Sequence, residues 1–182
     1  MEQSQVYKIV KWHKTKEEPG KNVGIFVPLP EDIANQFPPE GKEGEDSSPA
    51  HVTVLYVGDL EDSEKQEELI DVVQKTASVL GSFEVNLGRV EEFVNDENQR
   101  VTHSPVEGKD LHKLHNIMKG VLKFMKISFS DKYPEYKPHV TIEYISKGEE
   151  ERFGNVRPQG SWLIDHFWVW GADKPYMVKL GG

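Results

Sequence analysis

The chain has 182 residues, of which 36% are hydrophobic, a formal net charge of -9 and no cysteine. This length is enough to bury the core of an ordinary domain, and we expect residues 1–182 to form a single domain and a monomer. No apolar run approaches the roughly 18 residues that a membrane-spanning helix needs, so we expect no membrane association. Residues 1–10 lack the apolar stretch of a signal peptide, and the absence of cysteine excludes disulfides and thiolate-bound metals, which together indicate a cytoplasmic protein.

The net charge argues against long nucleic acid as a partner, because non-specific binding needs lysines and arginines that displace counterions from phosphates. A nucleotide or a short or cyclic oligonucleotide is compatible with it. The charge is also uneven, since residues 40–71 are rich in carboxylates whereas residues 109–137 contain seven lysines and only three acids. This lysine-rich segment is interpreted either as a solvated face or as a local field that attracts a phosphate.

Hydrophobic periodicity and turn residues predict the elements in chain order. Residues 1–21 are predicted as an extra N-terminal strand, at 6–12, and a charged loop, and residues 38–50 as a mobile acidic loop. Further strands are predicted at 23–29, 51–58, 83–93, 100–104, 139–146, 162–170 and 176–180. Helices are predicted at 30–37, 63–80 and 110–126. The helices are too few and too scattered for a doubly wound parallel sheet, so the predicted fold class is α+β.

Two heptapeptides of the chain repeat each other. His51-Val-Thr-Val-Leu-Tyr-Val57 and His139-Val-Thr-Ile-Glu-Tyr-Ile145 agree at His, Val, Thr and Tyr. Either motif alone would fit an ordinary edge strand with a structural histidine. The repeat instead predicts two related strands in a pseudo-twofold arrangement.

Side chains alternate across a strand, so each copy is expected to place its histidine and threonine on one face, with Leu55 joining them in the first copy and Glu143 in the second. One neutral imidazole can take a proton from water or a sugar hydroxyl while the other, protonated, donates to the departing oxygen. The hydroxyls can donate to phosphate oxygens. Acid–base chemistry on a phosphodiester, with no metal, is therefore predicted for four candidate catalytic residues: His51, Thr53, His139 and Thr141.

The chain resembles the two-histidine (2H) phosphoesterase superfamily, which includes 2'-5' RNA ligase-like proteins and cyclic phosphodiesterases. The resemblance rests on the paired motifs, on the segment Phe26-Val-Pro-Leu-Pro30 before a short helix, and on Lys137-Pro-His-Val-Thr141. The resemblance covers most of the chain. It implies a bilobal fold in which two pseudo-twofold-related antiparallel sheets line a central cleft, with helices packed outside. It also implies catalysis by the two histidines, with the two threonines holding the phosphate.

The expected function is metal-independent hydrolysis, without a cofactor, of a 2',3'-cyclic phosphate or of a 2'-5' or 3'-5' linkage in a small or cyclic oligonucleotide. Two alternatives stay open: a 2'-5' ligase-like activity on RNA ends, and a non-catalytic nucleotide-binding module. The sequence does not fix which linkage is cut or which histidine is the base.

Several other residues have two interpretations. Tyr136 and Lys137 are candidates for stacking on a base and for contacting a phosphate. Glu143 is a candidate for orienting an imidazole or contacting a ribose, and a solvated carboxylate is its alternative. His112 and His115 lie three apart in a predicted helix, but no third ligand accompanies them, so surface histidines are favoured over a metal site.

The remaining histidines and the tryptophans are assigned to structure. His13 and His103 are expected in loops or at strand ends. The alternating aromatic residues of the 162–170 strand suit a packed core, although such rings beside a phosphate site can also stack on bases.

Overall fold

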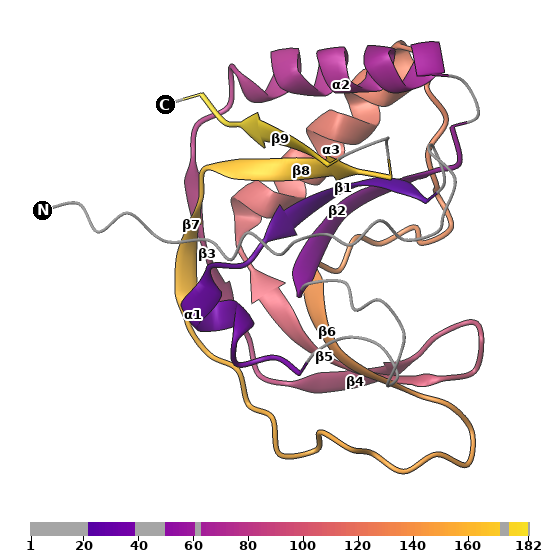
Figure 1. Ribbon diagram of the computed structural model, residues 1–182, viewed down its shortest axis with the longest axis vertical. Coiled ribbons are helices and arrows are strands. Elements are labelled where there is room, and N and C mark those ends of the chain that lie inside the picture. Colours follow the sequence, from indigo (N-terminus) through magenta and orange to yellow (C-terminus); the bar gives the residue numbers. More distant parts are fainter. Residues whose placement is uncertain (1–21, 39–49, 61–62, 172–174, 182) are drawn as a thin grey trace, which may run out of the picture.

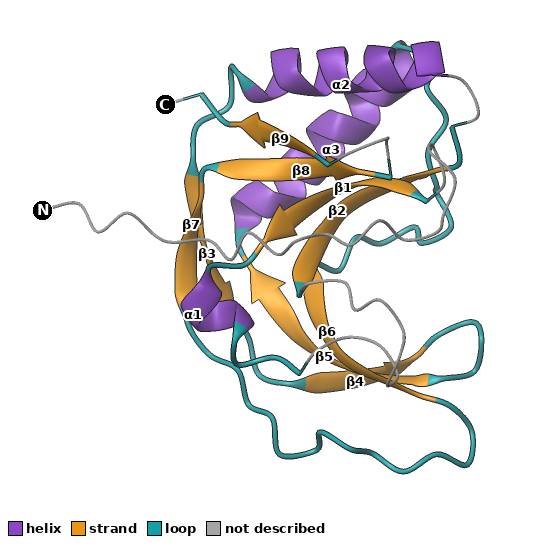
Figure 2. Cartoon of the chain, viewed as in Figure 1, coloured by secondary structure: helices purple, strands orange, loops and turns teal. Residues whose placement is uncertain are grey.

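The computed structural model describes residues 22–38, 50–60, 63–171 and 175–181, which form two antiparallel sheets with helices packed against them (Figures 1 and 2). The predicted N-terminal strand and loop at 1–21 lie outside the described residues, as does the acidic loop apart from Pro38 and Ala50. Within the described ranges, no helix combines the length and apolar character that crossing a membrane requires.

The first sheet has the strand order β2-β1-β8-β9. Its strands are β1 (Val23–Pro28), β2 (His51–Gly58), β8 (His166–Trp170) and β9 (Tyr176–Lys179). The second sheet is organised around one long strand that pairs with three others. A fifth strand pairs with one of those three. The central strand is β5 (Arg100–Glu107), its partners are β3 (Phe83–Leu87), β4 (Glu91–Val94) and β6 (His139–Ile145), and β7 (Ser161–Ile164) pairs with β3.

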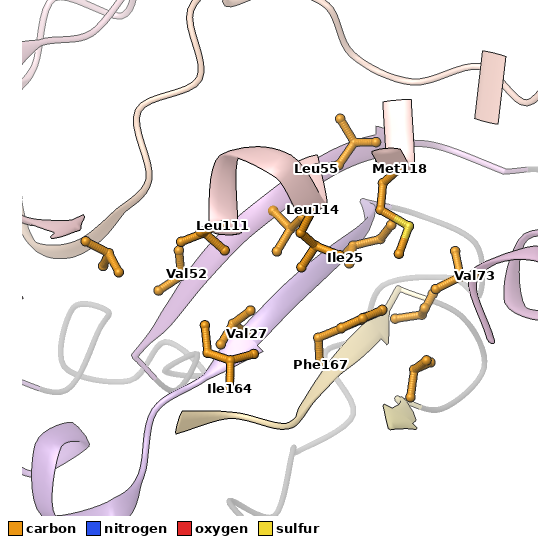
Figure 3. Close-up of a cluster of buried hydrophobic side chains, with 14 of the residues drawn as sticks. Ile25, Val27, Val52, Leu55, Val73, Leu111, Leu114, Met118, Ile164 and Phe167 are labelled. Atoms are coloured by element: carbon orange, nitrogen blue, oxygen red, sulfur yellow. The ribbon is translucent and has the colours of Figure 1, made fainter. Parts of the chain in front are cut away.

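Helices α2 (Ser63–Ala77) and α3 (Lys109–Phe124) cover one face of the first sheet, with α3 against β2 and α2 against β9 (Figure 1). The buried residues of each helix recur at helical spacing: Gln66, Leu69, Val73 and Ala77 in α2, and Leu111, Leu114, Met118 and Leu122 in α3. Figure 3 shows Leu111, Leu114 and Met118 of α3 packed over Ile25 and Val52 of the sheet. Burial of these apolar side chains holds the helices on the first sheet and covers the back of β2, the first motif strand.

Two predicted strands are each divided in the structure. The 83–93 strand is interrupted at Gly88, whose backbone N–H donates to the carbonyl of Pro105 at 2.7 Å. The 162–170 strand is interrupted at Asp165, where the chain leaves the second sheet and enters the first, because β7 pairs with β3 and β8 with β1. The predicted 30–37 helix is also shorter, since α1 spans Glu31–Ala34.

Candidate active site

The candidate site is built on β2 and β6, which lie side by side (Figure 1). Each strand begins with the histidine of its motif and carries the threonine two residues later. All four side chains are partly buried. The structure therefore brings the predicted catalytic residues to corresponding positions on neighbouring strands: His51, Thr53, His139 and Thr141.

Strand β1 supports the first motif. In its register Pro28 lies opposite His51 and Phe26 lies opposite Thr53. The ring of Phe26 packs edge-on against the imidazole of His51, with 4.9 Å between ring centroids. An apolar ring therefore backs the first histidine.

Strand β5 supports the second motif in the same register. Pro105 lies opposite His139, and His103 lies opposite Thr141. The His103 ring packs edge-on against His139 at 5.1 Å between centroids, and Phe93 packs against both imidazoles, at 5.0 and 5.7 Å. His103 was expected in a loop or at a strand end, and that expectation is wrong, because it lies inside β5 and is buried.

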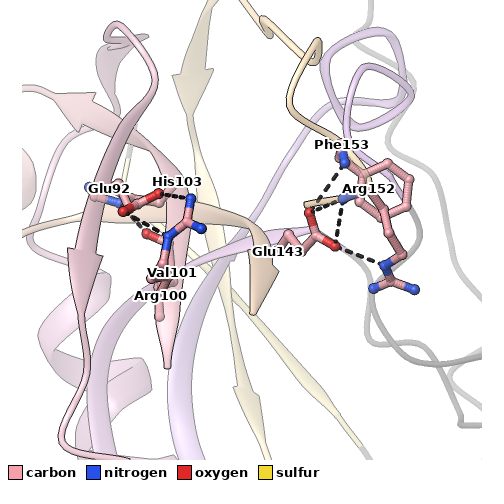
Figure 4. Close-up of polar contacts among 7 residues, drawn as sticks. All are labelled: Glu92, Arg100, Val101, His103, Glu143, Arg152 and Phe153. Atoms are coloured by element: carbon pink, nitrogen blue, oxygen red, sulfur yellow. Dashed lines mark hydrogen bonds and ion pairs between the residues drawn. The ribbon is translucent and has the colours of Figure 1, made fainter. Parts of the chain in front are cut away.

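The environment of His103 disfavours its charged form. Burial and the charge of His139 lower the pKa of His103, while the carbonyl of Val101 and the carboxylate of Glu91 oppose that shift. Its Nδ1 lies 3.4 Å from the Val101 carbonyl oxygen, and its Nε2 lies 4.0 Å from Glu91 (the Val101 contact is drawn in Figure 4). His103 is thus a further imidazole packed against His139, and its burial lowers its pKa.

The imidazole of His139 is held in one orientation by its own chain. Its Nδ1 lies 2.8 Å from the backbone carbonyl oxygen of Lys137. A carbonyl only accepts, so Nδ1 carries the hydrogen of this bond. The other nitrogen, Nε2, is then the one left to exchange a proton with a bound molecule.

Strand β2 contains a bulge in the middle of its motif. Phe26 opposes Thr53 and Ile25 opposes Leu55, so Val54 is an extra residue. A bulge reverses the alternation of side chains beyond it. Leu55 consequently points into the core, with 3% of its surface exposed, and does not share a face with the motif histidine.

Strand β6 has a bulge at the equivalent place, because His103 opposes Thr141 and Thr102 opposes Glu143, which leaves Ile142 as the extra residue. The prediction that Glu143 shares a face with the motif histidine and threonine is therefore wrong. It assumed a regular strand, and single-sequence alternation does not reveal a bulge.

The carboxylate of Glu143 is buried and holds the loop that follows β6 (Figure 4). It accepts hydrogen bonds from the backbone N–H groups of Arg152 and Phe153, at 3.1 and 3.2 Å, and from Nε of Arg152 at 2.8 Å. Three N–H donors therefore satisfy the buried carboxylate. A contact from Glu143 to a substrate stays a prediction.

The free edge of β2 is capped by polar groups from α3 and from the segment before the second motif. The Tyr136 hydroxyl donates to the Thr53 carbonyl at 2.9 Å, and Nδ1 of His115 donates to the Val54 carbonyl at 2.6 Å. The two rings stack in parallel with centroids 3.9 Å apart. Burial raises the pKa of Tyr136 and lowers that of His115. His115 is therefore half-buried rather than a surface residue, whereas His112 is exposed, as expected.

Acidic partners accompany much of the lysine-rich segment. Lys137 is exposed and lies 3.2 Å from Glu135. Four of the seven lysines form such ion pairs: Lys113–Asp110, Lys119–Asp131, Lys132–Asp96 and Lys137–Glu135. This pairing favours a solvated face over a local basic field, and the phosphate contact of Lys137 stays a prediction.

The tryptophans divide between the core and the face of the site. Trp162 on β7 is buried, as predicted for a core residue. Trp168 on β8 lies directly opposite Phe26, which lies opposite Thr53, so these three side chains share one face of the first sheet. Trp168 is half-buried there.

Among the described residues, no three histidine, aspartate or glutamate side chains gather as a group that could hold a metal ion.

Two antiparallel sheets whose adjacent edge strands each begin with His-x-Thr are the architecture of a two-histidine phosphoesterase. The sequence profile of the 2'-5' RNA ligase superfamily matches residues 33–175, and the chain belongs to this superfamily. The resemblance inferred from the paired motifs is thereby confirmed.

Solved structures share the fold at low sequence identity. TT0787 of Thermus thermophilus has a TM-score of 0.62 and 19% identity, over 87% of this chain and 94% of that one. LigT of E. coli in complex with 3'-AMP has a TM-score of 0.58 and 17% identity, over 90% and 96%. Usb1 of Kluyveromyces marxianus has a TM-score of 0.56 and 11% identity, over 88% and 99%. These likenesses confirm the predicted two-sheet α+β fold. No curated protein sequence matches the chain.

Proposed function

We propose that the chain is a metal-independent phosphodiesterase that hydrolyses a 2',3'-cyclic phosphate, or a 2'-5' or 3'-5' linkage, in a small or cyclic oligonucleotide. The observation that carries this proposal is the matched placement of two His-x-Thr motifs at the starts of adjacent edge strands. The matching bulges and the proline opposite each histidine extend that correspondence.

In the proposed reaction, one neutral imidazole removes a proton from water as the water oxygen attacks phosphorus. The other imidazole, protonated, donates to the ester oxygen as its bond to phosphorus breaks. The hydrogen bond from Nδ1 of His139 to Lys137 suits this role, because it fixes the tautomer and directs Nε2 to the reacting proton. Thr53 and Thr141 would donate to the non-bridging oxygens, where negative charge increases in the transition state.

The features around the site favour a small nucleotide over long RNA. Four of the seven lysines at 109–137 pair with acids, and the net charge is -9, so long-range attraction of polyanions is weak. Trp168 offers an aromatic surface on the same face as Thr53, where a base could stack. Structures of E. coli LigT, which shares the fold, hold 3'-AMP and ATP.

The test is incubation of the purified chain, in excess chelator, with 2',3'-cyclic nucleotides, 2'-5' and 3'-5' dinucleotides and cyclic oligonucleotides, followed by separation of the products. The proposal predicts hydrolysis of at least one of these and identifies the linkage by its product. Joining of RNA ends without hydrolysis would instead support the ligase-like activity. Nucleotide binding without turnover would support a binding module.

A further inference from the structure

The two halves of the site differ in the ring that backs each histidine. Phe26 and His103 occupy corresponding register positions, each opposite the threonine of its motif. Phe26 packs edge-on against His51 at 4.9 Å between centroids, and His103 packs edge-on against His139 at 5.1 Å. A ring that cannot take a proton backs one histidine, and a ring that can take one backs the other.

The surroundings of His103 come from three strands. Its own strand, β5, supplies the Val101 carbonyl oxygen at 3.4 Å from Nδ1. Strand β4 supplies Phe93, which packs against the ring, and the carboxylate of Glu91 at 4.0 Å from Nε2. Strand β6 supplies His139. The charge of His139 lowers the pKa of His103, and the charge of Glu91 raises it.

This geometry makes the two imidazoles compete for protons. Two positive rings with centroids 5.1 Å apart repel each other, and the burial of His103 strengthens that repulsion by excluding water. Glu91 offsets the repulsion only in part, because its side chain is 65% exposed and lies at the limit of ion-pair distance. A proton on either imidazole therefore disfavours a proton on the other.

We propose that His103 is a positioning residue that couples to His139, so that the second half of the site shares one proton between two imidazoles. Phe26 cannot give this coupling to His51. The inference rests on the proposed function for its role in turnover, where it makes the two motif histidines unequal although their motifs match. The coupling itself is a property of the folded chain without substrate.

The test is an NMR titration of the full chain that follows the imidazole Cε1–H signals of His51, His103 and His139 from about pH 8.5 to about pH 4.5. Groups that interact by more than about one pK unit lose their protons in two shared steps. We expect the His103 and His139 signals to move in the same two steps. A one-step curve for His139 in the unmodified protein would overturn the proposal, and this comparison needs no variant.

Two matched substitutions sharpen the result. His103→Phe installs the ring that the first half already uses, and it should convert the His139 curve to one step while leaving the His51 curve unchanged. Phe26→His is the reciprocal change and should alter the His51 curve alone. An unchanged His139 curve in folded His103→Phe, judged by its amide spectrum, would also overturn the proposal.

A functional readout separates coupling from packing. With a hydrolysed substrate, His103→Phe should change the acidic side of the pH–rate profile, which a purely structural role would leave unmoved. The same profile in both proteins would overturn the role of His103 in turnover. Coupled titration without any turnover would contradict the proposed function and leave the coupling intact.

Discussion

His115 donates a hydrogen bond through Nδ1 to the carbonyl oxygen of Val54 at 2.6 Å. Val54 is the extra residue of the bulge in β2, which lies at the edge of its sheet. The bond from Tyr136 to Thr53 caps the preceding carbonyl. Helix α3 and the segment before the second motif thus hold the first motif strand in its bulged form.

His115→Ala should lower the free energy of unfolding by about 1–3 kcal/mol, because it leaves a partly buried carbonyl without its donor. Tyr136→Phe, which removes only the hydroxyl, should lower it by about 1 kcal/mol. The comparison variant is His112→Ala on the same helix, an exposed residue whose ring packs edge-on against Tyr136 at 5.3 Å between centroids, so it should cost less than His115→Ala. Urea unfolding measures all three, and equal effects of His115→Ala and His112→Ala would contradict the capping role.

The pKa values of His103 and His115 are lowered from about 6.5, the ordinary pKa of histidine. The free energy of unfolding should therefore fall as the pH drops below about 6.5. In this window the unfolded chain binds more protons than the folded chain, so the free energy of unfolding rises with pH and its full value is present above about pH 6.5. Urea unfolding at about pH 7.5 and at about pH 5.5 measures this change in the free energy of unfolding. Both pH values lie above the range where carboxylates titrate, so the change reports on histidines. His115→Gln should reduce the difference, and equal or greater stability at the lower pH would refute the account.

The hydroxyl of Thr102 is buried and has no hydrogen-bond partner among the described residues, opposite Glu143 in the register. Thr102→Val keeps the shape and removes the unpaired group, so it should stabilise the protein by about 1 kcal/mol. The control is Ser104→Ala on the same strand, which removes a bond to the Gly88 carbonyl at 2.9 Å and should destabilise by a similar amount. Thermal unfolding shows whether each variant is more or less stable than the unmodified protein. A loss of stability in Thr102→Val would show that the hydroxyl is bonded.

Glu143→Ala removes the acceptor of the Arg152 and Phe153 backbone N–H groups, so hydrogen exchange at these two amides should accelerate. Turnover should fall by less than two orders of magnitude, which is the smallest loss expected for a group that exchanges a proton with the substrate. Arg152→Ala is the milder control, because both backbone bonds remain. A large loss of turnover with unchanged amide protection would instead support a substrate contact by Glu143.

The sequence predicted the motif strands and the helices that cover the first sheet, because their periodicities are set by burial on one face. The repeat also predicted two related strands, and β2 and β6 do carry the two motifs side by side. Alternation alone misplaced Leu55 and Glu143, since a one-residue bulge leaves no mark in the residue types. The division at Asp165 was equally hidden, because apolar residues continue on both sides of it.

His103 was missed for a different reason. It lies outside both motifs, and only the register of β5 against β6 shows that it corresponds to Phe26. Strand pairing across about forty residues is a tertiary property that local patterns do not encode. The contacts of His115 and Tyr136 with β2 are of the same kind.

The most direct test of the central claim compares turnover of the unmodified chain with that of His51→Ala and His139→Ala, in chelator, on the substrate that the product panel identifies. The account predicts that each single change lowers turnover by about two to four orders of magnitude, as expected for acid–base groups, while the circular dichroism spectrum stays that of the folded protein. Full turnover in either folded variant would contradict a two-histidine mechanism.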